Sequence, residues 1–225
     1  MKVALIGVTG RVGSRVTAEL LSRGHLVTGI ARHPESARPQ AGLDLKKGDA
    51  ENPSSLTPLL AKHDAVITAT RFQTSDATAL LAAVKEAGCQ RLLVVGGAAS
   101  LLVGPDKPLI ETPDVPEAYK PEAQAGIKFL EVLRAEKELE WTFLSPSADF
   151  APGRRKGQFR IGADHLLVDD AGRSWISMED YAIALVDELE HPKHIRQRFT
   201  VGLLRLSTGA LLSRTRFECL SPRAL

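Results

Sequence analysis

The amino-acid sequence predicts an α/β fold: a doubly wound, mostly parallel sheet with helices on both faces. Short apolar runs alternate with stretches of helical periodicity along most of the 225 residues. The first run, residues 3–8, is nearly apolar throughout, as expected of a parallel strand that is buried on both faces. Alternation of this kind builds a parallel sheet, and right-handed crossovers leave few topologies for it.

Five helices are predicted from apolar residues that recur every three or four positions. Gly24 and Gly88 follow the first and third helices, where a left-handed C-terminal cap belongs. Pro53 suits the first turn of the second helix. Ser177, with Asp180 three residues later, has the spacing of a capping box at the start of the fifth. The predicted ranges are 11–23, 53–62, 75–87, 120–138 and 178–190.

The strands are short and rich in branched residues. We expect them at residues 3–8, 25–31, 43–48, 65–69, 91–95, 141–144 and 199–201. Residues 159–161 and 166–168 suggest a hairpin, and 174–176 a further extended piece. We assign residues 1–202 to a single domain, with a small C-terminal substrate lobe at about 146–177. Residues 203–225 show no clear period and are interpreted as an irregular tail.

Composition excludes several classes of function. The net charge of +2 is too small to indicate nucleic acid or a membrane surface as a partner. Cys89 and Cys219 are far apart and show no metal-ligand spacing, so we expect neither a disulfide framework nor a metal site. A reducing cytoplasm fits this cysteine usage. The oligomeric state is not indicated.

A bend with three glycines separates the first strand from the first helix, and its context predicts an anion site. Gly7 lets the chain leave the strand tightly, Gly10 removes a side chain where a pyrophosphate approaches the backbone, and Gly13 lets the helix pack closely against the sheet. Free N–H groups and the helix dipole then favour an anion. The alternative is a close-packed turn without a ligand.

The end of the second strand predicts which dinucleotide binds. NAD-binding proteins usually end this strand with an acid, whereas here it ends in Ala31-Arg32-His33 and we expect no acid nearby. Arg32 can pair with a 2′-phosphate, and Arg11 could add a second cation, so NADP(H) is preferred and NAD(H) remains an alternative. Asp49, after the third strand, either reaches the adenine amino group or accepts hydrogen bonds in a turn.

These residues resemble a known family. The motifs Gly7-Val-Thr-Gly-Arg-Val-Gly13, Gly48-Asp49, Val94-Val-Gly-Gly-Ala-Ala-Ser100 and Trp141-Thr-Phe-Leu-Ser-Pro-Ser147 are similar to those of atypical short-chain dehydrogenase/reductases with a Rossmann fold, in the NmrA-like and biliverdin/flavin-reductase-like branch. Members are often labelled NAD-dependent epimerase/dehydratase. The resemblance implies that the cofactor lies against Gly7, Thr9, Gly10, Arg11, Val12, Gly13, Ala69, Thr70, Gly96, Pro146 and Ser147.

The chain departs from this family in its catalytic residues. Standard members carry Tyr-x-x-x-Lys, but here Tyr119 is followed four residues later by Ala123. Lys120 is adjacent to the tyrosine and faces elsewhere on a helix. Ser100 and Tyr119 are the remaining catalytic candidates, each with a structural role as the alternative. The basic run at residues 154–156 either covers a ligand or is a solvated loop.

Two functions follow from this pattern. The first is an NADP(H)-dependent oxidoreductase that reduces a small acceptor such as a flavin, quinone or carbonyl and draws the proton from solvent. The second is a regulatory protein that binds NADP(H) without turnover. Both place a small molecule, rather than nucleic acid or a membrane, at the carboxyl ends of the strands.

Overall fold

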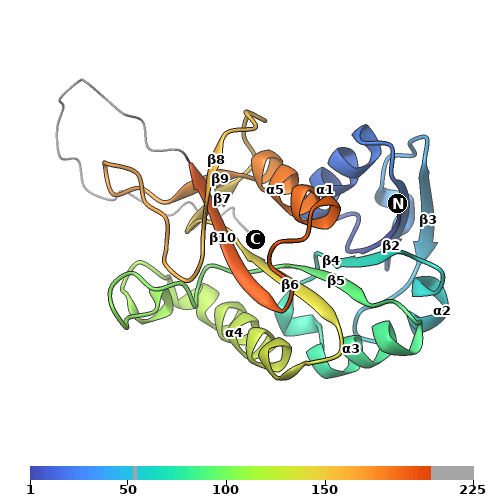
Figure 1. The fold of residues 1–225 in the computed structure, drawn as a ribbon, viewed down its shortest axis with the longest axis horizontal. Coiled ribbons are helices and arrows are strands. Elements are labelled where there is room, and N and C mark those ends of the chain that lie inside the picture. Colours follow the sequence, from blue (N-terminus) through green and yellow to red (C-terminus); the bar gives the residue numbers. More distant parts are fainter. Residues whose placement is uncertain (53–54, 204–225) are drawn as a thin grey trace.

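The computed structural model describes residues 1–52 and 55–203, so Pro53 and nearly all of the predicted tail lie outside the described residues. Its centre is an eight-stranded sheet in the order β3-β2-β1-β4-β5-β6-β10-β8 (Figure 1). The strands are β1 (Lys2–Ile6), β2 (Leu26–Ala31), β3 (Leu43–Lys47), β4 (Ala65–Thr68), β5 (Arg91–Val95), β6 (Glu140–Ser145), β8 (Phe159–Gly162) and β10 (Gln197–Leu203). All neighbours are parallel except β8 and β10. The predicted fold class is confirmed.

Helices cover both faces of this sheet (Figure 1). They are α1 (Arg11–Ser22), α2 (Thr57–Leu60), α3 (Ala77–Glu86), α4 (Lys120–Ala135) and α5 (Met178–Glu190). Alternate residues of β1 point to opposite faces. Val3 and Leu5 therefore join one core cluster with α1 and α5, whereas Ala4 and Ile6 join another with α2, α3 and α4. Two apolar layers thus hold the sheet.

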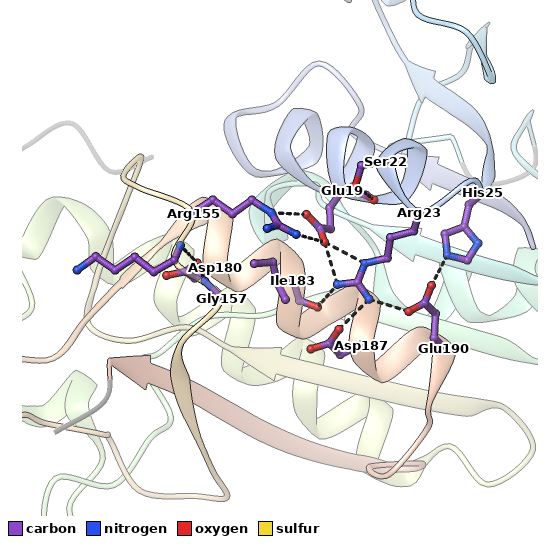
Figure 2. Close-up of polar contacts among 11 residues, drawn as sticks. Glu19, Ser22, Arg23, His25, Arg155, Gly157, Asp180, Ile183, Asp187 and Glu190 are labelled. Atoms are coloured by element: carbon purple, nitrogen blue, oxygen red, sulfur yellow. Dashed lines mark hydrogen bonds and ion pairs between the residues drawn. The ribbon is translucent and has the colours of Figure 1, made fainter.

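Helices α1 and α5 lie side by side, and ion pairs join them at both ends. Arg15 pairs with Glu179 near the N-termini at 3.0 Å. Arg23 pairs with Asp187 at 2.7 Å and with Glu190 at 2.6 Å near the C-termini (Figure 2). These pairs fix α5 parallel to α1, so the N-termini of both helices lie at the edge where the parallel strands end.

The predicted hairpin is wrong. Strand β8 pairs with β10, which is far away in sequence, and residues 166–168 form no strand. Instead the Leu166 amide donates to the Leu102 carbonyl at 2.9 Å. The predicted extended piece at 174–176 is β9 (Trp175–Ser177), which forms a small sheet with β7 (Asp149–Ala151), a strand that the sequence did not indicate.

Three predicted helices are shorter than expected. Helix α3 occupies Ala77–Glu86 of the expected range 75–87. Helix α2 occupies only Thr57–Leu60 of the expected range 53–62. Helix α4 ends at Ala135 rather than 138. There the Glu136 carboxylate accepts from the amides of Glu138 and Leu139, so these amides bond to a side chain instead of continuing the helix.

Within the described ranges, every helix is too short or too polar to cross a lipid bilayer.

Candidate functional site

The bend between β1 and α1 is fixed by contacts that only glycine allows. Gly7 has φ +90°, and a Cβ there would lie 2.6 Å from the Ala69 carbonyl oxygen at the end of β4. A Cβ on Gly13 would lie 2.0 Å from the Gly7 carbonyl oxygen. Gly13 therefore packs against the bend itself rather than against the sheet, which corrects the role expected from the sequence. The bend sits at the carboxyl ends of β1 and β4, where ligands bind in folds of this class.

Helix α1 begins without any protein group to neutralise its N-terminus. Gly10 is its N-cap and supplies no side chain, and the first turn contains no acid. Among the described residues, the N–H groups of Val12 and Gly13 have no acceptor. In contrast, Asp76 caps α3 and Ser177 caps α5; the four-residue α2 and α4 also lack a side-chain cap, but α4 has Glu122 in its first turn. The bend and the first turn of α1 thus expose amide donors and a positive dipole end, which fit the pyrophosphate of a dinucleotide.

Thr9, Arg11 and Val12 lie in this bend or in the first turn of α1, where the resemblance places them. The Arg11 carbonyl accepts from the Arg15 guanidinium at 3.0 Å. These residues have the location that the proposed contacts need.

The predicted partner of the 2′-phosphate has an acidic neighbour. Arg32 follows β2, and its Nη1 lies 3.4 Å from Glu51 Oε1, with the two side chains 63% and 50% exposed. The expectation that no acid lies near Arg32 is therefore wrong in space, and in the sequence Glu35 stands only three residues further on. Asp49 Oδ1 accepts from the Glu51 amide at 3.1 Å, so Asp49 serves as a turn acceptor that positions Glu51.

The ends of the neighbouring strands are tightly bonded. The Ala69 amide donates to the Ile6 carbonyl at 2.9 Å, and the Thr70 hydroxyl lies 3.0 Å from that of Thr68 and 2.8 Å from that of Ser75. A Cβ on Gly96 would lie 2.4 Å from the Phe143 ring. Gly96 is therefore required for packing of β5 against β6, whether or not a cofactor also touches it.

Pro146 and Ser147, which follow β6, are buried. The Ser147 hydroxyl donates to the Val201 carbonyl at 2.9 Å and holds the end of β6 against β10. Within this structure, that hydroxyl is committed to the protein, so any contribution from this segment to a cofactor comes from its shape and backbone.

The two catalytic candidates are not joined to each other. Ser100 Oγ accepts from Arg198 Nη1 at 3.4 Å, so its hydroxyl lies against the start of β10. Tyr119 is the N-cap residue of α4 and is half-buried. Lys120 pairs with Glu117 and not with the phenol. The described residues therefore contain no Tyr–Lys pair.

The chain's other tyrosine cannot replace Tyr119. Tyr181 is fully buried; its hydroxyl donates to the Leu144 carbonyl at 2.7 Å and accepts from the Gly96 amide at 3.2 Å. Burial raises the pKa of Tyr181 far above its ordinary value. Tyr181 positions the ends of β5 and β6 and is not a proton donor.

The basic run at residues 154–156 is anchored to the helices. Arg155 donates to both carboxylate oxygens of Glu19 at 2.9 Å, and the Lys156 and Gly157 amides donate to Asp180 Oδ1 (Figure 2). Burial alone would raise the pKa of Glu19, but hydrogen bonds from Arg155 and Arg23 lower it. The run thus connects the segment between β7 and β9 to α1 and α5.

The site contains two contacts that the sequence did not indicate. Glu51 approaches Arg32, and the Glu122 carboxylate of α4 accepts from the amides of Phe72 and Gln73 at 2.7 and 3.1 Å. Glu122 thereby fixes the segment after β4. In each case the partners are distant in sequence, so no local pattern marks them. The described residues contain no group of three His, Cys, Asp or Glu side chains that could hold a metal ion.

Comparison with known proteins places this geometry in a family. Residues 7–192 match the NAD(P)H-binding family. A Bacillus subtilis (strain 168) protein, the uncharacterized protein YwnB, is 39% identical over 89% of this chain and 98% of its own. A crystal structure from Bacteroides thetaiotaomicron, provisionally described as an epimerase, is 41% identical with a TM-score of 0.86 and covers 92% of this chain and 99% of its own.

A second crystal structure, provisionally described as an NADH-flavin reductase from Streptococcus pneumoniae TIGR4, is 34% identical with a TM-score of 0.79. It covers 91% of this chain and 100% of its own. The chain belongs to the NAD(P)H-binding family, and its resemblance to the atypical short-chain dehydrogenase/reductases is confirmed.

Proposed function

We propose that this protein is an NADP(H)-dependent oxidoreductase that reduces a small acceptor by hydride transfer. The observation that carries the proposal is the N-terminus of α1, which lies behind a bend without side chains and has no cap of its own. An anion from outside the protein satisfies these amides. Membership of the NAD(P)H-binding family supports the dinucleotide pyrophosphate as that anion.

The preference for NADP(H) rests on Arg32. Its exposed guanidinium is free to turn from Glu51 towards a 2′-phosphate, with which it forms charge-assisted hydrogen bonds. Glu51 opposes this preference, because its carboxylate repels a phosphate and can accept a hydrogen bond from a ribose 2′-hydroxyl. NAD(H) is therefore the alternative cofactor, and Arg32 determines that NADP(H) is preferred.

The bound dinucleotide would supply the hydride, and the chain's own residues would bind and orient the dinucleotide and enclose the acceptor. The bend and the first turn of α1 would hold the pyrophosphate, Ala69 and Thr70 would lie beside the adenosine ribose, and the segment after β6, which is buried, would border the nicotinamide. Since no lysine accompanies Tyr119, an acceptor that takes its proton from solvent suits this site better than a simple ketone.

The acceptor is a small molecule that lies between the cofactor and a substrate lobe at residues 146–177. In this lobe β7 and β9 pair, and the anchored run at 154–156 holds them to α1 and α5. The relative provisionally described as an NADH-flavin reductase favours a flavin. We place this activity in a reducing compartment such as the cytoplasm.

The test is turnover with a panel of acceptors. Purified protein is mixed with NADPH and with flavins, quinones or carbonyl compounds, and the loss of reduced-nicotinamide absorbance is followed. Turnover that disappears in Gly10→Asp, which places a carboxylate in the anion site, supports the enzyme. Absence of binding of both NADPH and NADH would overturn the proposal.

The missing Tyr–Lys pair also favours a second function, a regulatory protein that binds NADP(H) without turnover. The same experiment separates the two. Tight NADPH binding, lost in Gly10→Asp, combined with no oxidation by any acceptor, supports the sensor and excludes the reductase for that panel.

A further inference from the structure

A basin lies at the opposite edge of the sheet from the glycine bend, where β6 and β10 begin and α4 ends. Its volume is about 330 Å³. Trp141 and Arg198 form its buried floor, whereas Arg134, Asp164 and Arg196 are exposed around it. Of these residues, only Arg198 contacts a candidate described above, through its hydrogen bond to Ser100.

Positive charge dominates this basin. Arg198, whose side chain is 3% exposed, donates from Nε to Asp164 Oδ1 at 2.8 Å, so these two charges compensate each other. Arg196 Nη1 donates to the Lys137 carbonyl at 2.9 Å, and no carboxylate of the described residues pairs with it. The Arg134 guanidinium has no partner among the residues that the structure describes. Two uncompensated guanidinium groups therefore line one basin.

The C-terminus of α4 explains why some, but not all, of these cationic side chains lie at this place. Its carbonyls attract cations, because the helix dipole is negative there. Lys137 Nζ already donates to the Arg134 carbonyl, and Arg196 donates to that of Lys137. The Arg134 side chain is not used in this way.

The backbone at Arg196 adds an independent observation. Arg196 has φ +54°, a left-handed conformation that an arginine adopts only when its surroundings impose it. Its amide donates to the Trp141 carbonyl, and this bond turns the chain at the edge of the basin. Lys62, with φ +63°, is the only other non-glycine residue with positive φ in the described ranges, and it does not line the basin.

We propose that this basin binds a doubly charged oxyanion of the phosphate-monoester class between Arg134 and Arg196. Planar guanidinium groups bind such oxygens through paired, charge-assisted hydrogen bonds. Trp141, on the floor of the basin, would lie below the anion. This second anion site is separate from the dinucleotide site, and its existence does not depend on the proposed function.

Inorganic phosphate is the probe, and Trp141 is the reporter. The chain has two tryptophans, so Trp175→Phe leaves Trp141 as the sole source of indole fluorescence. Phosphate is added at constant ionic strength to the full chain, and we expect a saturable fluorescence change with a Kd of about 1 mM. The response must persist in Gly10→Asp, which excludes binding at the glycine bend.

Matched variants assign the site. Arg134→Gln should weaken phosphate binding by about tenfold. Arg196→Gly should also weaken it while relieving the backbone, whereas Lys62→Gly relieves the same kind of backbone and should leave binding unchanged. A wild-type titration without saturation up to about 10 mM, or equal affinity in Arg134→Gln and the wild type, would overturn the proposal. Loss of the response in Gly10→Asp would overturn it as well.

Discussion

Removing the charge of Glu51 should strengthen NADPH binding and leave NADH binding nearly unchanged. Glu51 Oε1 lies 3.4 Å from Arg32 Nη1, and both side chains are largely exposed. Exposed ion pairs of this kind contribute about 0.2–1 kcal/mol, and this contribution is lost when a 2′-phosphate displaces Glu51 from Arg32. A phosphate with about two negative charges, at about 5 Å from the Glu51 carboxylate, adds a repulsion of about 1–2 kcal/mol in water.

After screening by salt, these two effects sum to about 1–2 kcal/mol, so the NADPH Kd of Glu51→Gln should fall about 5- to 30-fold. NADH lacks the phosphate, and its Kd should change by less than about threefold. The assay is calorimetric titration of both cofactors against the wild type, Glu51→Gln, Arg32→Ala and the double variant. Asp44→Asn, an exposed acid on β3 paired with Lys46, is the matched control.

In the Arg32→Ala background, the effect of Glu51→Gln should shrink, because the pair no longer has to be broken. Equal gains for NADPH and NADH, or weaker NADPH binding in Glu51→Gln, would refute the assignment of Arg32 and Glu51 to the 2′ position.

Three further predictions concern the bend and the buried charges. Gly13→Ala should lose both stability and NADPH binding, since its Cβ would lie 2.0 Å from the Gly7 carbonyl oxygen. The Cβ of Gly10→Ala would lie 3.2 Å from the same oxygen, so this variant should keep its thermal midpoint and weaken NADPH binding about tenfold or more. Equal thermal midpoints for both variants would contradict this prediction. Glu188→Ala should lower the free energy of unfolding by about 3–5 kcal/mol in urea titrations, because it leaves the Arg91 guanidinium buried without its carboxylate, and Glu138→Ala at the surface should have a much smaller effect. The folded-state pKa of Glu19 lies below the ordinary 4.5, so the stabilisation by its carboxylate is present above about pH 4.5 and is lost as the pH falls through the folded pKa. Glu19→Gln should therefore be less stable than the wild type at neutral pH and similar to it in strong acid. A stability difference that stays constant at all pH values would exclude this coupling.

The elements that the sequence predicts best are those whose pattern is local. The fifth strand is found at the predicted residues, and α1 and α5 end within a residue of the expected positions. Helical periodicity, caps and glycines after helices involve residues a few positions apart. The predicted cap at Ser177 is present, since its hydroxyl accepts from the Asp180 amide at 3.0 Å.

The failures concern partners that are distant along the chain. Strand β8 pairs with β10, about 40 residues away, whereas the sequence pattern favours the nearer run at 166–168 as its partner. Glu51 approaches Arg32 because β2 and β3 are neighbours in the sheet, and Glu122 reaches Phe72 from α4. In each pair, the sequence around the second residue does not indicate its partner, because side-chain pairing between distant segments depends on topology rather than on sequence spacing.

The glycines of the bend illustrate a further limit. Gly7 and Gly13 are demanded by contacts within the chain, namely the Ala69 carbonyl and the Gly7 carbonyl, so their presence would be required even without a ligand. The evidence for a ligand is what α1 lacks. Its N-cap has no side chain and its first turn has no acid, whereas α3 and α5 have a cap from their own sequence. A helix that directly follows a buried strand and begins without a capping residue is therefore a stronger indication of a bound anion than the count of glycines before it.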